Sequence, residues 1–165
     1  MTDNLNIKIF ADGADLDGIK KMYANPLIQG FTTNPTLMRK VGIRDYTTFA
    51  RQVLEIVPDR PVSFEVFADE FDEMEKQALE IASWGPNVNV KIPVTNTKRE
   101  FAAPLIGRLS NAGVKVNVTA LMTVDQVRGI SEALNADVPA IISVFAGRIA
   151  DTGVDPVPVM AEALE

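Results

Sequence analysis

Short runs of β-branched and aromatic residues alternate along the chain with longer stretches whose apolar residues recur at three- and four-residue spacing. The short runs are only a few residues long and rich in Val, Ile or Phe, which is typical of buried strands. The stretches between them predict amphipathic helices, one of them through Met74, Ala78 and Ile81. The predicted strands cover residues 7–11, 29–32, 62–66, 88–92, 114–118 and 140–144.

Successive strands begin roughly 23–33 residues apart, which is the length of one βα unit. Thr123 followed by Gln126 predicts a capping box and a helix start. The last helix is predicted to start near Asp155 and to run to the end of the chain. The pattern therefore predicts an α/β protein of six βα units, with a parallel sheet covered by helices. We expect residues 1–165 to form one domain.

Six such units fit two architectures, an open doubly wound sheet or a (β/α)8 barrel that lacks its last two units. A nucleotide-binding open sheet carries GxGxxG after the first strand, or a GxxxxGK[ST] loop. The first turn here reads FADGADLDG, and neither motif occurs in the sequence. Their absence weakens the open-sheet interpretation without excluding it.

The 165-residue chain contains no cysteine and no histidine, and its net charge is −6. These absences exclude disulfides, thiol nucleophiles, thiolate zinc sites and catalytic triads built on histidine. The acidic balance argues against a non-specific nucleic-acid binder. The N-terminus lacks the features of a signal peptide, and no apolar run approaches the ~20 residues that span a bilayer. We expect a protein of the cytoplasm with no membrane or nucleic-acid partner.

Polar residues recur towards the C-terminal half of five predicted strands, on the face away from the aliphatic residues. A parallel strand covered by helices is almost continuously apolar, and an unpaired buried polar atom costs about 1–3 kcal/mol. In a barrel these side chains converge on the C-terminal mouth, where active sites of this fold are built. The convergence indicates an enzyme. The residues are Asp12, Glu65, Lys91, Asn117 with Thr119, and Ser143.

Each candidate also has a purely structural interpretation, and the sequence alone leaves these alternatives open. Lys91 could extend its amine to water, and Glu65 could be the salt-bridge partner of Lys91. Asp12 could be an Asx-turn or helix N-cap residue, and Asn34 a turn residue before proline. Thr119 could lie at the end of a strand, and Arg148 could be an exposed loop arginine.

In combination, these residue types fit one kind of chemistry. An amine in a desolvated, apolar site is a nucleophile towards carbonyls, because burial in general favours the neutral form of lysine. Carboxylates can move protons for it, directly or through water. Lysine imine chemistry of this kind requires neither histidine nor cysteine nor a metal ion.

Six segments resemble the transaldolase family, in particular its short microbial branch, in order over essentially the whole chain. The resemblance implies a (β/α)8 barrel of the class I aldolase type, with no metal and no cofactor. The segments are FADGADLDGIKKM, GFTTNPTLM, FEVFAD, VNVKIPVT, VNVTALM and ISVFAGRIAD.

The resemblance also implies catalytic roles. Lys91 in VKIPVT is similar to the Schiff-base lysine that attacks the ketose C2 carbonyl. Asp12 in FADGAD corresponds to the base that takes the C4 hydroxyl proton while the C3–C4 bond breaks. Glu65 and Thr119 correspond to the residues that hold and activate the water of imine formation and hydrolysis.

The substrate-binding roles follow in the same way. Asn34, Asn117 and Ser143 are expected to hydrogen-bond the dihydroxyacetone hydroxyls. Phe145 is expected to form a wall of the site. Arg148 is expected to bind the sugar phosphate, for which the guanidinium fork is suited.

The implied function is that of a transaldolase of the pentose phosphate pathway. It would convert sedoheptulose 7-phosphate and glyceraldehyde 3-phosphate to erythrose 4-phosphate and fructose 6-phosphate. The related fructose-6-phosphate aldolases generally carry Gln where this chain has Glu65, so aldolase-like activity is the alternative.

A second alternative follows from length, because a (β/α)8 barrel typically needs about 250 residues. Family members continue for two more strands, so we expect the barrel to be incomplete at its C-terminus. On that alternative the chain is a catalytically inactive, truncated fragment. At full length we expect a homo-oligomer that binds small sugar phosphates.

Overall fold

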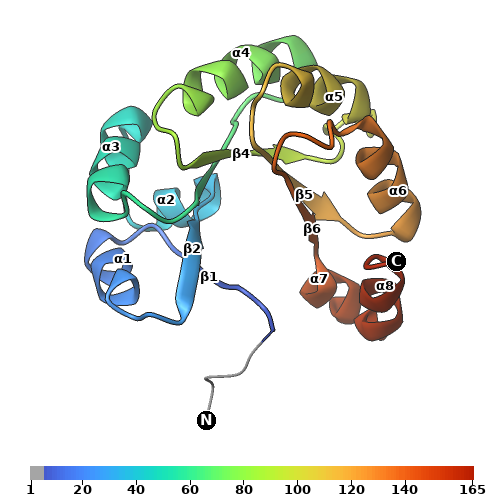
Figure 1. Cartoon of the computed structure of the whole chain (residues 1–165), viewed down its shortest axis with the longest axis horizontal. Coiled ribbons are helices and arrows are strands. Elements are labelled where there is room, and N and C mark those ends of the chain that lie inside the picture. Colours follow the sequence, from blue (N-terminus) through green and yellow to red (C-terminus); the bar gives the residue numbers. More distant parts are fainter. Residues whose placement is uncertain (1–5) are drawn as a thin grey trace. The chain divides into compact units, whose positions relative to one another are not determined.

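The computed structural model describes residues 6–165, in which six strands and eight helices alternate along the chain (Figure 1). The elements are β1 (Ile9–Asp12), α1 (Leu16–Tyr23), β2 (Ile28–Thr32), α2 (Pro35–Lys40), α3 (Tyr46–Ile56), β3 (Val62–Glu65), α4 (Phe71–Ala82), β4 (Val88–Pro93), α5 (Ala103–Asn111), β5 (Val116–Leu121), α6 (Val124–Ala133), β6 (Ile141–Val144), α7 (Ala146–Asp151) and α8 (Pro156–Glu162).

The strand order in the sheet follows the chain order from β1 to β6, and the strand pairs β1–β2, β2–β3, β4–β5 and β5–β6 are parallel. The predicted α/β class with six βα units is confirmed. The chain divides into two compact units, which we describe separately. Unit 1 contains the residues up to Glu65 together with Ile81–Asn89, and unit 2 contains Val66–Glu80 and Val90–Glu165. The prediction of one domain stays a prediction.

In unit 1, helices α1 and α3 pack against each other (Figure 1). The core of this unit is formed by large side chains such as Phe31, Phe49 and Phe64, which are at most 3% exposed. Helix α1 begins after Asp15, whose carboxylate accepts a hydrogen bond of 2.7 Å from the amide of Gly18. Asp12 is therefore not the N-cap of this helix, and that interpretation is wrong.

In unit 2, the aliphatic residues of the strands form the core. Val90, Ile92, Val116 and Val118 are all fully buried. Helices α5 and α6 lie side by side (Figure 1). The predicted capping box is confirmed, because Thr123 and Gln126 bond reciprocally at the start of α6.

The predicted strand at residues 114–118 is shifted, since β5 covers Val116–Leu121. The reason is the end of α5, where Gly113 adopts a left-handed φ of 85°. The amides of Gly113 and Val114 donate to the carbonyls of Ser110 and Leu109, which is a Schellman motif. Val114 therefore belongs to the helix cap although its side chain is typical of a strand.

Two short helices, α2 and α7, follow β2 and β6 and were not predicted. The last helix begins after Asp155 as expected, but it ends at Glu162 rather than continuing to the last residue. No helix within residues 6–165 is long and apolar enough to cross a membrane.

Candidate functional site

Lys91 lies within β4 of unit 2 and is almost completely buried, with only 8% of its surface exposed. Its chain neighbours Val90 and Ile92 are fully buried. Little of this side chain is in contact with water, which does not favour the first of the structural alternatives. In the sheet Lys91 is directly opposite Asn117 of β5.

Asn117 and Ser143 lie on the same face of unit 2, as predicted, since their side chains are bonded. The Ser143 hydroxyl donates to Oδ1 of Asn117 at 2.7 Å. Asn117 is 2% exposed and Ser143 is half-buried. Lys91 and Asn117 are opposite each other in parallel strands, and Ser143 lies two residues beyond Ile141, the residue opposite Asn117. The three side chains therefore share one face and form a polar row across three strands.

Thr119 lies inside β5, two residues after Asn117, so it is not a strand end. It is 3% exposed, and within the described part of the chain its hydroxyl has no hydrogen-bond partner. The register of β5 against β6 shifts between Val118 and Leu121. Ala120 at this irregularity has a φ of 65°, which a residue with a side chain adopts at a cost of about 1–2 kcal/mol. A bulge next to an unsatisfied buried hydroxyl is typical of a functional site.

Phe145 and Arg148 line a hollow of about 500 Å³ at the end of β6. Phe145 is 36% exposed, and Arg148 lies on α7 with 73% of its side chain exposed. Arg148 is therefore in a helix rather than a loop. Its guanidinium donates to the carboxylate of Asp151 at 3.0 Å, an exposed ion pair that contributes little stability and that an anionic ligand could replace.

In unit 1, Asp12 is the last residue of β1 and is exposed. Its Oδ1 accepts a hydrogen bond of 2.7 Å from the hydroxyl of Thr32, the residue opposite it in β2. Asp12 also lines a mainly apolar hollow of about 300 Å³ with Ile19, Phe31 and Leu37. The carboxylate is thus oriented by its neighbour while remaining accessible.

Asn34, two residues after the end of β2, and Glu65, at the end of β3, also belong to unit 1. Asn34 caps α2, accepting a hydrogen bond of 2.9 Å from the amide of Leu37. Glu65 is the half-buried last residue of β3, and its backbone carbonyl accepts a hydrogen bond of 2.9 Å from the hydroxyl of Tyr46. Asn34 therefore precedes proline as predicted, but it caps a helix rather than only forming a turn.

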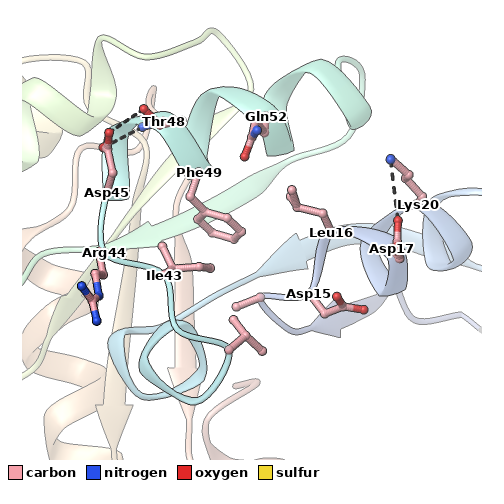
Figure 2. Close-up of a pocket in the computed structure, with 12 residues that line it drawn as sticks. Asp15, Leu16, Asp17, Lys20, Ile43, Arg44, Asp45, Thr48, Phe49 and Gln52 are labelled. Atoms are coloured by element: carbon pink, nitrogen blue, oxygen red, sulfur yellow. Dashed lines mark hydrogen bonds and ion pairs between the residues drawn. The ribbon is translucent and has the colours of Figure 1, made fainter.

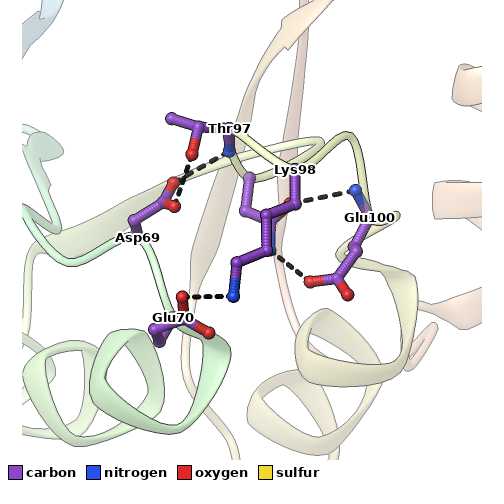
Figure 3. Close-up of polar contacts among 6 residues, drawn as sticks. Asp69, Glu70, Thr97, Lys98 and Glu100 are labelled. Atoms are coloured by element: carbon purple, nitrogen blue, oxygen red, sulfur yellow. Dashed lines mark hydrogen bonds and ion pairs between the residues drawn. The ribbon is translucent and has the colours of Figure 1, made fainter.

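The loop that follows β4 is fastened by charged and polar contacts within unit 2 (Figure 3). The carboxylate of Asp69 accepts hydrogen bonds from the amide and the hydroxyl of Thr97, at 2.8 and 2.6 Å. These bonds hold the pKa of Asp69 below its usual range. Lys98 forms an ion pair with Glu70. The loop after the strand of Lys91 is therefore held in one arrangement.

A second hollow in unit 1, of about 480 Å³, lies between α1 and α3 (Figure 2). Phe49, Leu16 and Ile43 form its apolar floor, and charged side chains such as Arg44 and Lys20 lie at its rim. None of the predicted site residues lines it. Among residues 6–165, no group of three or more acidic side chains is arranged to hold a metal ion.

Three features of the site were not found from the sequence. They are Thr32 beside Asp12, the bulge at Ala120, and Tyr46 beside Glu65. Thr32 could have been found, because a hydroxyl and a carboxylate at the ends of neighbouring strands meet when the strands are in register. The other two depend on a local irregularity and on a contact across 19 residues, for which the sequence contains no short-range signal.

The family model for Transaldolase/Fructose-6-phosphate aldolase matches residues 9–165. A "Probable transaldolase" of Dehalococcoides mccartyi is 42% identical over 149 residues, which are 90% of this chain and 65% of that protein. A "Probable transaldolase" of Methanococcus maripaludis is 36% identical over 159 residues, which are 96% of this chain and 69% of that protein. The chain thus spans about two thirds of the length of these relatives.

One solved structure, a pyruvate carboxylase of Rhizobium etli, matches 94% of this chain and 19% of that chain with a TM-score of 0.54. At 14% sequence identity this likeness concerns the fold alone. Together with the family match, it agrees with the (β/α) barrel class predicted from the sequence, of which six βα units are present here.

Proposed function

The chain belongs to the transaldolase/fructose-6-phosphate aldolase family, and from this premise we propose that it is a transaldolase whose Schiff-base residue is Lys91. The observation that carries the proposal is a lysine 8% exposed within a strand, in one polar row with Asn117 and Ser143. Charged side chains are rarely buried within strands, and a desolvated amine is a nucleophile for carbonyl carbon.

In the proposed reaction, Nζ of Lys91 adds to C2 of a ketose phosphate, and loss of water gives an iminium ion. Asp12 takes the proton of the C4 hydroxyl. The C3–C4 bonding electrons then move into the iminium, which leaves an enamine on Lys91 and releases an aldehyde. The enamine adds to an acceptor aldehyde by the reverse steps, and water hydrolyses the new imine.

Thr119 and Glu65 are proposed to hold the water that carries protons during imine formation and hydrolysis. The buried hydroxyl of Thr119, which lacks a partner within residues 6–165, supports this role. A water bonded there would satisfy the hydroxyl and stand in the same strand face as Asn117.

The remaining residues are proposed to bind the substrate. Asn117 and Ser143 would bond the dihydroxyacetone hydroxyls, and Asn34 would add the amide hydrogens that its capping oxygen leaves available. Arg148 would bind the sugar phosphate in the hollow it shares with Phe145. Donors would be fructose 6-phosphate or sedoheptulose 7-phosphate, and acceptors erythrose 4-phosphate or glyceraldehyde 3-phosphate. The location in the cytoplasm and a homo-oligomeric state are part of the same proposal.

The test is borohydride reduction of the chain in the presence of fructose 6-phosphate, followed by intact mass measurement. We expect a reduced three-carbon adduct on the wild-type chain and on Lys115→Met, a matched control from the neighbouring segment of unit 2. Lys91→Met should form none. An unreactive wild type would favour the inactive-fragment alternative, and turnover by Lys91→Met would overturn the mechanism.

Adding erythrose 4-phosphate distinguishes transfer of the dihydroxyacetone unit to an acceptor from cleavage that releases free dihydroxyacetone. A transaldolase forms sedoheptulose 7-phosphate faster than it releases dihydroxyacetone. Faster release of dihydroxyacetone would instead identify the fructose-6-phosphate aldolase alternative.

A further inference from the structure

Tyr46 forms a hydrogen bond with the backbone of Glu65. It is the first residue of α3, and its hydroxyl donates to the carbonyl of Glu65 at 2.9 Å. Glu65 is the residue that the proposed function assigns to the catalytic water. Tyr46 itself comes from a separate helix and has no place in the proposed reaction.

The hydroxyl donates to a carbonyl for which the segment after β2 has no backbone N–H at the corresponding position. In the β2–β3 pair, Phe31 donates to the carbonyl of Pro61 and Thr33 donates to the carbonyl of Ser63. The next rung of this ladder would run from residue 35 to Glu65, but residue 35 is a proline and has no N–H. The hydroxyl of Tyr46 donates to the Glu65 carbonyl in place of this N–H.

Aromatic neighbours hold the ring of Tyr46, and a capped helix start holds its backbone. Its ring lies edge-on to Trp84, with centroids 5.2 Å apart, and to Phe64, with centroids 6.1 Å apart. Its backbone follows the N-cap residue Asp45, which accepts hydrogen bonds from the amide and the hydroxyl of Thr48. Burial raises the pKa of Tyr46 well above its ordinary value, so the hydroxyl remains a donor.

The peptide group between Glu65 and Val66 is therefore bonded at its oxygen by Tyr46. The nitrogen of the same peptide group, that of Val66, donates to the carbonyl of Lys91 at 3.1 Å. The direction in which Glu65 leaves β3 depends on the orientation of this peptide group.

We propose that Tyr46 is a positioning residue for the reaction, whose hydroxyl replaces the absent N–H of Pro35 and fixes the orientation of Glu65 at the end of β3. This inference rests on the proposed function. It predicts that loss of the hydroxyl slows the proton transfers to and from the imine without weakening the binding of the sugar phosphate.

The test compares Tyr46→Phe with Tyr23→Phe. Both substitutions remove a single hydroxyl that donates over 2.9 Å, and Tyr23 bonds the exposed side chain of Asp59. We expect kcat of Tyr46→Phe with fructose 6-phosphate to fall tenfold or more, while KM stays within twofold. Tyr23→Phe should keep both constants. Rates are normalised to the folded fraction, read from near-ultraviolet circular dichroism at the assay temperature.

Trp84→Phe disturbs the same aromatic cluster but keeps the hydroxyl, and it should retain kcat per folded molecule. A tenfold loss in Trp84→Phe as well would show that packing alone is responsible and would overturn the inference. If the wild type is active and Tyr46→Phe has the same kcat, the inference is overturned and the proposed function is not affected. A wild type that forms no adduct would overturn both.

Discussion

Two predicted site residues of unit 1, Asp12 and Asn34, differ in their structural surroundings from two of unit 2, Lys91 and Thr119. In unit 1, Asp12 ends β1 and Asn34 caps α2, and both have partners for their side-chain oxygens. In unit 2, Lys91 and Thr119 lie within strands and are buried, and the hydroxyl of Thr119 has no partner among residues 6–165. Side chains of the first kind contribute to local structure. A buried hydroxyl such as that of Thr119 reduces stability unless a ligand or water bonds it.

The same substitution should therefore have different effects on stability in the two units. Thr119→Val removes a buried hydroxyl that no protein group bonds within residues 6–165, so the free energy of unfolding should not fall. Thr32→Val removes the hydrogen bond to Asp12, so the free energy of unfolding should fall by about 0.5–1 kcal/mol. Urea unfolding measures both.

Of the two variants, Thr119→Val should also have the larger effect on the rate of the reaction. If its hydroxyl holds the proton-carrying water, kcat should fall by about 10²-fold, while Thr32→Val retains more activity. A Thr119→Val variant that is both less stable and fully active would show that the hydroxyl has a structural partner and no part in the reaction.

The sequence predicts the strands and the row of polar side chains, because both follow from the period-two alternation along VNVKIPV and AIISVF. It does not predict the position of β5, since Val114 has a typical strand side chain but a backbone committed to the cap of α5. It also does not distinguish Asp12 from Asp15 as the N-cap of α1, because both precede the same amphipathic stretch. Which acidic residue caps the helix depends on where the strand ends.

Backbone strain at the bulge of β5 should have a smaller effect on the stability of unit 2. Ala120→Gly relieves a left-handed φ of 65°, so the variant should be more stable by up to about 1 kcal/mol. Ala133→Gly, at the end of α6, is the matched control and should be less stable by up to about 1 kcal/mol. If Ala120→Gly were destabilised as much as the control, the residue would not be under backbone strain.

The smallest expected effect concerns the loop fastened by Asp69. Hydrogen bonds from Thr97 lower the pKa of Asp69 in the folded chain, below the value of about 3.9 for an unpaired aspartate. Its contribution is therefore complete above about pH 4 and is lost as the pH falls through the lower, folded pKa. Protection of the Thr97 amide from hydrogen exchange should decrease over that range.

Asp69→Asn should remove this dependence on pH and leave the protection of Thr97 uniformly low. Because Asp69 is solvent-accessible, we expect little change in overall stability. Protection that falls with acid equally in Asp69→Asn would assign the effect to other carboxylates.

The most direct test of the central claim is to locate the trapped adduct in the sequence. The chain is reduced with borohydride in the presence of fructose 6-phosphate, digested, and mapped by tandem mass spectrometry. We expect a three-carbon adduct on Nζ of Lys91 alone, with Lys76, Lys98 and Lys115 unmodified. An adduct on another lysine, or equal labelling of exposed lysines, would contradict the assignment of the Schiff base to the buried row of unit 2.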